Sequence, residues 1–341
     1  TKKYAFMVGP TNSACMFQLG AVTGAAKIPL IAGGAADHQP FMELYQPLAF
    51  HPSVSTFLEG RASAIAAWKL GWRTAGVFVP NYAYGQDAAK AFEQQFKAMG
   101  GKIVSHQEAP FNESDFGKYI NPILATKPDG LFTAFFGPLI PPFWKYWIGS
   151  GQAGKVGLIS GLVVLATSQV VKSPTDIPKD AYGYNRAEPH LLGTTKLGAA
   201  LAKVYKSTQG SKHPEISEFA FTAFSSMQLA KALIEKTHSL NGADWQKAVE
   251  AGDFSFDSPY HSGPTYVNPV NHMADSCVAV GKVSWDPKRA KGVQQTMDPK
   301  TFIVSCMDDV LGAAEAVKLT KNKTVSKAAI TKYYSIKKPQ N

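Results

Sequence analysis

The side chains that could do chemistry in this sequence lie where predicted helices begin and predicted strands end. Asn12 and Ser13 begin a predicted helix, where backbone N–H groups and a hydroxyl suit a carboxylate. Tyr82 and Tyr84 follow an apolar strand and could form an aromatic wall of a ligand site. The full set of candidate ligand contacts is Asn12, Ser13, Ala35, Ala36, Asp37, Tyr82, Tyr84, Phe136, Leu162 and Tyr184.

A structural interpretation competes with the functional one at these positions. Ser13 could only cap its helix, Ala35 and Ala36 could form a tight turn, and many of the aromatic residues could belong to the core. Tyr84 could simply pack beside Gly85. Residue types alone leave both interpretations open.

Motifs of known catalytic centres do not account for these residues. The sequence contains no Gly-x-Ser-x-Gly nucleophile elbow and no His-Glu-x-x-His zinc motif. Its eight histidines are scattered, and none pairs with another at metal-ligand spacing. We therefore expect a binding protein and not an enzyme, with no metal and no cofactor.

The composition is that of a globular protein with an ample apolar core. Apolar residues make up 45% of the 341 positions, and the mean hydropathy is −0.12. No apolar run approaches the roughly 18 residues that a membrane span needs, so we expect no integral membrane segment.

The net charge of +10 is concentrated at the C-terminus. Seven lysines lie between residues 318 and 341, and about +3 remains without them. Aromatic residues are not interleaved with this charge except at Tyr333 and Tyr334, so nucleic acid is not an expected partner. A solvated basic tail or helix is the simpler interpretation, and contact with a membrane surface or a partner is the alternative.

The three cysteines fit no zinc spacing. Cys277 and Cys306 lie in strand-like segments, so a disulfide in an oxidising compartment is one interpretation and two buried free thiols are the simpler one. Cys15 stands at a predicted helix start, where the helix dipole favours a thiolate, but a packed helix cysteine is the simpler interpretation.

Strands and helices alternate through residues 69–136. Apolar periodicity with Gly and Pro breaks predicts strands at 75–79, 102–105 and 128–136, and helices at 86–99 and 115–125. A similar unit precedes it, with strands at 4–9 and 28–32 and a helix at 12–26. Such alternation predicts parallel sheets, whose ligand sites lie at the carboxyl ends of the strands.

The chain length favours two lobes, between which the chain passes more than once. Residues 40–55, which are rich in proline, and residues 181–184 are the expected crossings. The predicted first lobe combines residues 1–52 and 186–270, and the second combines 53–185 and 271–310. Residues 311–341 form the predicted basic C-terminal helix or tail.

Several short blocks of sequence have a distinctive spacing. The most specific are Tyr82-Ala-Tyr-Gly85 and Ser114-Asp-Phe116, and the others are Gly9-x-x-Asn12-Ser13, Ile28-Pro-Leu-Ile31, Gly33-Gly-Ala-Ala36, Pro128-Asp129 and the stretch from Gly263-Pro to Asn271-His272. Over most of the chain they resemble the type I periplasmic substrate-binding proteins of the branched-chain amino-acid and amide class.

The resemblance implies two doubly wound α/β lobes joined by a multi-stranded hinge, with a ligand cleft between them. It implies a solute-binding protein that delivers a small ligand to the permease of an ABC importer, in the periplasm or as an extracellular lipoprotein anchored to the membrane. It also implies that Ser13 and the loop at Ala35 and Ala36 hold a ligand carboxylate, while Tyr84 closes over the ligand from the opposite lobe.

The sequence departs from that family at the strand end occupied by Leu162. Amino-acid binders of the family place an acid there to pair with the ligand ammonium, and an unpaired buried ammonium costs several kcal/mol. Unless Asp37 substitutes, a branched-chain amino acid is a poor ligand. We expect an apolar or aromatic carboxylate or a neutral amide, and Phe136 and Tyr184 favour the same choice.

The sequence also starts later than the family pattern does. The first strand-helix-strand-helix unit of the family has no counterpart before Thr1, so we expect the first lobe to be incomplete in this chain. A ligand-sensing receptor or regulator of the same fold is the alternative function. An enzyme on a doubly wound fold is the third alternative.

Overall fold

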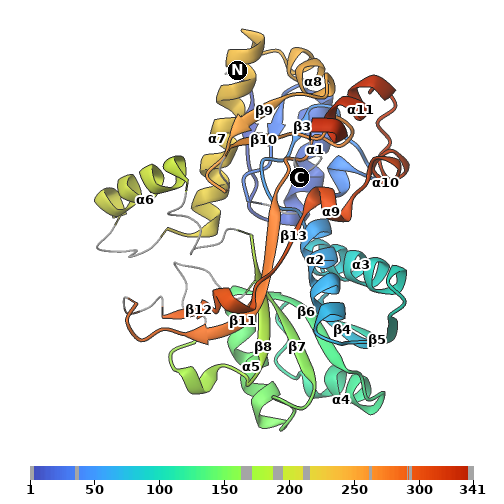
Figure 1. Cartoon of the computed structure of the whole chain (residues 1–341), viewed down its shortest axis with the longest axis vertical. Coiled ribbons are helices and arrows are strands. Elements are labelled where there is room, and N and C mark those ends of the chain that lie inside the picture. Colours follow the sequence, from blue (N-terminus) through green and yellow to red (C-terminus); the bar gives the residue numbers. More distant parts are fainter. Residues whose placement is uncertain are drawn as a thin grey trace.

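The computed structural model describes residues 4–34, 38–162, 171–186, 195–209, 216–260, 263–289, 291 and 294–336. These residues form two α/β lobes, one in the upper half and one in the lower half of Figure 1. The candidate contacts Ala35, Ala36 and Asp37 lie outside the described residues.

The first lobe is built around a small parallel sheet with the strand order β1-β2-β3. Its strands are β1 (Met7–Val8), β2 (Leu30–Ile31) and β3 (Ala49–Phe50), and its helices are α1 (Ser13–Ala25), α6 (Lys196–Gln209), α7 (Glu218–Thr237) and α8 (Gly242–Glu250). The 3-10 turn η1 (Gln39–Phe41) precedes β3, and β9 (Ser255–Asp257) pairs antiparallel with β10 (Pro264–Tyr266).

The second lobe contains an eight-stranded sheet in the order β12-β11-β8-β7-β6-β4-β5, with β13 paired to β11. Its strands are β4 (Thr74–Pro80), β5 (Lys102–Ala109), β6 (Gly130–Phe136), β7 (Gly157–Leu162), β8 (Ala181–Asn185), β11 (Cys277–Trp285), β12 (Gln295–Met297) and β13 (Ile303–Cys306). Its helices are α2 (Thr56–Lys69), α3 (Ala83–Ala98), α4 (Gly117–Ala125) and α5 (Ile140–Gly149), with 3-10 turns η2 (Gly137–Leu139), η3 (Pro174–Asp176) and η4 (Pro299–Thr301).

The core of this sheet follows from its apolar strands. β4 is buried along all but its first residue and pairs in parallel with β5 and β6, as expected for a strand covered on both faces. The residue after Tyr84 must be a glycine, because a Cβ on Gly85 would lie only 2.2 Å from the carbonyl oxygen of Pro80. Only glycine lets the first turn of α3 pack this closely on the end of β4, and this packing fixes the position of Tyr84.

Each of the two predicted crossings between the lobes contains a strand. Within residues 40–55, Ala49 and Phe50 are buried and form β3, a strand that was not expected from the sequence. Because prolines flank this strand of two residues, the sequence pattern did not predict it. Residues 181–184 belong to β8, and the chain then reaches the first lobe at Arg186, whose Nη1 donates to the carbonyl oxygen of Gly34 at 2.9 Å.

The cysteines differ from the simpler interpretation of the sequence. Cys277 and Cys306 form a disulfide that joins β11 to β13, so the expectation of two buried free thiols is wrong. Strand pairing places the two residues opposite each other in register, which sequence spacing could not show. Cys15 is free and exposed on α1, not packed in the core.

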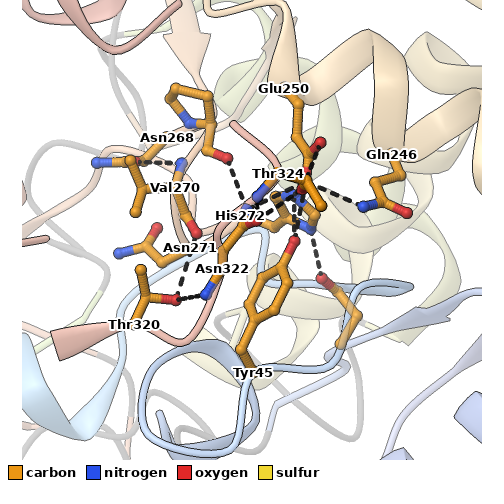
Figure 2. A network of polar contacts seen from close by, with 12 residues as sticks. Tyr45, Gln246, Glu250, Asn268, Val270, Asn271, His272, Thr320, Asn322 and Thr324 are labelled. Carbon is orange, nitrogen blue, oxygen red and sulfur yellow. Dashed lines mark hydrogen bonds and ion pairs between the residues drawn. The ribbon is translucent and has the colours of Figure 1, made fainter. Parts of the chain in front are cut away.

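Residues 311–336 of the C-terminal region contain helices that pack against the first lobe, in agreement with the helix alternative of the prediction. Helix α9 (Met307–Val310) precedes α10 (Ala313–Leu319) and α11 (Lys327–Ile336), and Tyr333 on α11 is fully buried. Figure 2 shows the polar network that holds the connecting loop, in which Glu250 accepts hydrogen bonds from Asn322 at 3.1 Å and Thr324 at 2.9 Å. No helix among the described residues is long and apolar enough to cross a membrane.

Candidate ligand-binding site

A cavity of about 180 Å³ lies where the two lobes meet. The first lobe contributes the start of α1, Gly34 and Phe219, and the second contributes residues that follow or end its parallel strands. The lining residues are Thr11, Asn12, Ser13, Gly34, Tyr82, Tyr84, Phe136, Leu162, Arg186 and Phe219. The position agrees with the general rule for parallel sheets, whose ligands bind at the carboxyl ends of the strands.

Six of the ten candidate contacts line this one cavity. They are Asn12, Ser13, Tyr82, Tyr84, Phe136 and Leu162. Tyr184 lies behind the wall, where it is fully buried and bonded to Tyr84. Their roles in binding stay predictions, because a shared cavity does not by itself show a ligand contact.

The start of α1 supplies the polar end of the first-lobe wall. Asn12 is the N-cap, and its Oδ1 accepts from the backbone N–H of Ala14 at 2.9 Å. Ser13 is the first helical residue and is 5% exposed. The partial positive charge of the helix N-terminus therefore faces the cavity, where it favours an anionic group.

Aromatic rings form the wall of the second lobe. The ring of Phe136 lies with its centroid 5.5 Å from that of Tyr84 and 6.0 Å from that of Tyr82. Phe219 lies on the wall of the first lobe. Rings on both walls suit a flat, apolar ligand body.

Arg186 is the functional residue that the sequence reasoning missed. It follows β8 directly, is 5% exposed and lines the cavity. Its Nε donates to Oε1 of Glu59 at 2.5 Å, and its guanidinium carbon lies 5.8 Å from the Tyr84 ring centroid and 5.9 Å from that of Phe219. The sequence held only a weak signal, since Arg186 is one of four arginines and follows the expected crossing at residues 181–184.

Two buried acids surround this arginine. Glu59 is fully buried and Glu218 is 4% exposed. Burial raises the pKa of Glu59, and the charge of Arg186 opposes that rise. Burial also raises the pKa of Glu218, to about 7, with Arg186 again opposing the rise and Glu59 adding to it. The site therefore holds one cation and up to two anions.

The tyrosines of the site act as neutral hydrogen-bonding groups. The hydroxyl oxygens of Tyr84 and Tyr184 are 2.8 Å apart. Burial raises the pKa of both phenols, and the charge of Glu59 adds to the rise. Burial likewise raises the pKa of Tyr82. None of the three is therefore a phenolate near neutral pH.

One glycine-rich motif was also missed, and the structure does not give it the strand-loop-helix arrangement of a phosphate-binding loop. Gly149-Ser-Gly-Gln-Ala-Gly-Lys155 has the spacing of phosphate-binding loops. Those loops connect a strand to the N-terminus of the following helix. This segment instead connects the end of α5 to β7, so it does not lead into a helix. No group of three or more metal-ligating side chains occurs among the described residues.

The fold and the cavity define a two-lobed α/β protein with a small cavity where its lobes meet. Residues 1–292 match the family model described as periplasmic binding protein, and the chain belongs to that family. The family and the two-lobed α/β fold predicted from the sequence are thereby confirmed. No curated protein matches the sequence.

Solved structures with this fold include proteins with different ligands. A solute-binding protein of an R. palustris ABC transporter in complex with 4-hydroxybenzoate is 21% identical, with a TM-score of 0.68 over 86% of this chain and 78% of that one. Another from R. palustris in complex with benzoate is 18% identical, with a TM-score of 0.66 over 88% and 76%. The leucine-, isoleucine-, valine-, threonine- and alanine-binding protein of Brucella ovis is 18% identical, with a TM-score of 0.74 over 90% and 79%.

Proposed function

We propose that this protein captures a small aromatic carboxylate between its lobes and delivers it to the permease of an ABC importer on the periplasmic side of the membrane. The observation that carries the proposal is the position of Arg186 at the wall of an aromatic cavity between the lobes. The role is binding and not catalysis, as in the family to which the chain belongs.

The polar end of the cavity supports a carboxylate. The Arg186 guanidinium and the N-terminus of α1 both line this end, and each can donate N–H groups to an anion. Arginine is also the side chain whose planar donors best fit a carboxylate. In this proposal the ligand carboxylate lies between Arg186 and the backbone N–H groups near Ser13.

The remaining walls support an aromatic body. Tyr82, Tyr84 and Phe136 on one lobe and Phe219 on the other lie around the cavity. The volume of about 180 Å³ is small beside the 300 to 1,000 Å³ of typical drug-sized sites, so it suits a ligand of one ring. The two R. palustris structures with 4-hydroxybenzoate and benzoate support this ligand class.

The residue at the end of β7 argues against an amino acid. Leu162 lines the cavity and offers no charge to a ligand ammonium. Glu59 is hydrogen-bonded to Arg186, and Glu218 is not part of the cavity lining. Among the described residues, the lining therefore offers no acidic partner to a buried ammonium, which would cost several kcal/mol, and Asp37 lies outside those residues.

A thermal-shift panel tests the proposal. Benzoate and 4-hydroxybenzoate at concentrations far above their dissociation constants should raise the unfolding temperature, because a ligand that binds only the native state stabilises it by RT ln(1 + [L]/Kd). Benzamide, with the same ring and no charge, and leucine should give smaller shifts. Stabilisation by leucine with none by the benzoates would contradict the proposal.

A further inference from the structure

Glu218 is a buried acid beside the cavity that the proposed ligand contacts do not use. It is the first residue of α7, and its chain neighbour Phe219 lines the cavity. Neither of its carboxylate oxygens makes a hydrogen bond of good geometry in the described part of the chain, although the backbone amide of Arg186 favours its charged form from nearby. Glu59, by contrast, accepts the Nε–H of Arg186.

The charges around Glu218 do not balance. Among the described residues, the charged or titratable groups that act on it are Arg186 at the end of β8, Glu59 on α2 and Tyr260 after β9. Burial raises the pKa of Tyr260 and outweighs the opposing effect of its 2.6 Å hydrogen bond with Thr222, so the phenol stays neutral. With both acids ionised, the cluster has one negative charge in excess.

A ligand carboxylate placed against Arg186 would add a second negative charge to this cluster. Buried like charges disfavour each other's ionised form, so one of the acids must become neutral. Glu59 keeps its charge through its direct contact with Arg186, whereas Glu218 has no side-chain donor to hold its charge. On the basis of the proposed function, we infer that the carboxylate ligand binds together with one proton, which the Glu218 carboxylate takes up to become a carboxylic acid.

The pKa of Glu218 in the absence of ligand is consistent with such a proton uptake. The pKa of Glu218 is raised to about 7, so the group is about half protonated at neutral pH before any ligand binds. Proton binding and ligand binding are linked reciprocally, so a ligand that favours protonated Glu218 binds more tightly at a pH where Glu218 is already protonated. The affinity should be constant below about pH 6 and should fall by up to about tenfold per pH unit above pH 7.

Calorimetric titration with benzoate as the probe tests this inference. The binding enthalpy is measured between pH 5.5 and 8.5 in buffers of different ionisation enthalpy, which gives the number of protons taken up per ligand. We expect almost none at pH 5.5, about one half at pH 7 and a value approaching one at pH 8. Glu218→Gln should take up no proton on binding. At every pH it should bind benzoate with the affinity that the unmodified protein has at pH 6. The control Glu235→Gln, on the exposed part of the same helix, should behave as the unmodified protein.

The possible results separate this inference from the proposed function. Benzoate binding without proton uptake, or uptake that persists in Glu218→Gln, overturns the inference and leaves the proposed function intact. No benzoate binding at any pH in either protein overturns both. A ligand-free measurement adds an independent test, because an acid whose pKa is raised by burial loses native-state stability as pH rises from about 4.5 to 7. Glu218→Gln should become more stable than the unmodified protein across that window, and equal profiles would overturn the inference.

Discussion

Arg186 and Glu59 form a buried ion pair in which Nε and Oε1 are 2.5 Å apart. The pair connects the end of β8 to α2, and the same guanidinium reaches Gly34 of the first lobe. One cation therefore touches both lobes and the cavity between them. Since a buried charge without its partner is costly, each member of the pair depends on the other.

Arg186→Met should abolish carboxylate binding and destabilise the fold. Glu59 would be left as an uncompensated buried charge, a situation that typically costs about 3–5 kcal/mol. Urea unfolding followed by circular dichroism measures the loss of stability, and calorimetry with benzoate measures the loss of binding.

The double variant Glu59→Gln with Arg186→Met separates the two effects. Removing both charges should restore most of the stability but not the binding. A double variant as unstable as the single one would contradict the buried-charge explanation. Benzoate affinity unchanged by Arg186→Met would contradict the role of Arg186 in the site.

The ring of Tyr84 should matter more for ligand binding than its hydroxyl does. The hydroxyl is bonded to that of Tyr184 inside the wall, so Tyr84→Phe should change benzoate affinity by less than about threefold. Tyr84→Ala removes the ring from the cavity and should weaken binding by about tenfold or more. Calorimetric titration of both variants checks this, and equal losses would show that the hydroxyl contacts the ligand.

Local sequence patterns predicted the parts of the fold that depend on neighbouring residues. The helix that Asn12 caps and the apolar strand β4 follow directly from capping and apolar runs. The disulfide and β3 depend on pairing between distant segments, which no local pattern encodes. Arg186 escaped notice for the same reason, because its partner Glu59 lies 127 residues away in the sequence.

Glu250 should make the attachment of the C-terminal region sensitive to acid. Burial opposes ionisation of Glu250, but hydrogen bonds from His272, Gln246 and Thr324 lower its pKa from 4.5 to about 2. A lowered folded-state pKa contributes stability that is present above about pH 4.5 and is lost as pH falls towards 2. The hydroxyl of Tyr45 also donates to this carboxylate at 3.1 Å, and both residues are drawn in Figure 2.

Glu250→Gln should therefore cost roughly 1–3 kcal/mol at pH 7 and progressively less below pH 4.5. Urea unfolding of both proteins between pH 2.5 and 7 measures this difference. Glu235→Gln is the matched control, since Glu235 is exposed and pairs only with Lys231 among the described residues. A cost that does not change with pH would contradict the assigned role of the Glu250 charge.

The disulfide between Cys277 and Cys306 should contribute to stability. It closes a loop with a sequence separation of 29 residues, for which the chain-entropy estimate is about 3–4 kcal/mol. Cys277→Ser combined with Cys306→Ser should lower the free energy of unfolding by about 2–4 kcal/mol in urea titrations. A reducing agent should lower the stability of the unmodified protein and not that of the double variant. An equal response of both proteins would show that the bond is not formed.

Calorimetric titration of benzoate and of leucine into the unmodified protein at pH 6 tests the central claim most directly. The claim is that Arg186 and the aromatic walls select a small aromatic carboxylate. The expected result is saturable one-site binding of benzoate, lost in the Glu59→Gln and Arg186→Met double variant, with no measurable binding of leucine. One-site binding of leucine with no heat from benzoate would contradict it.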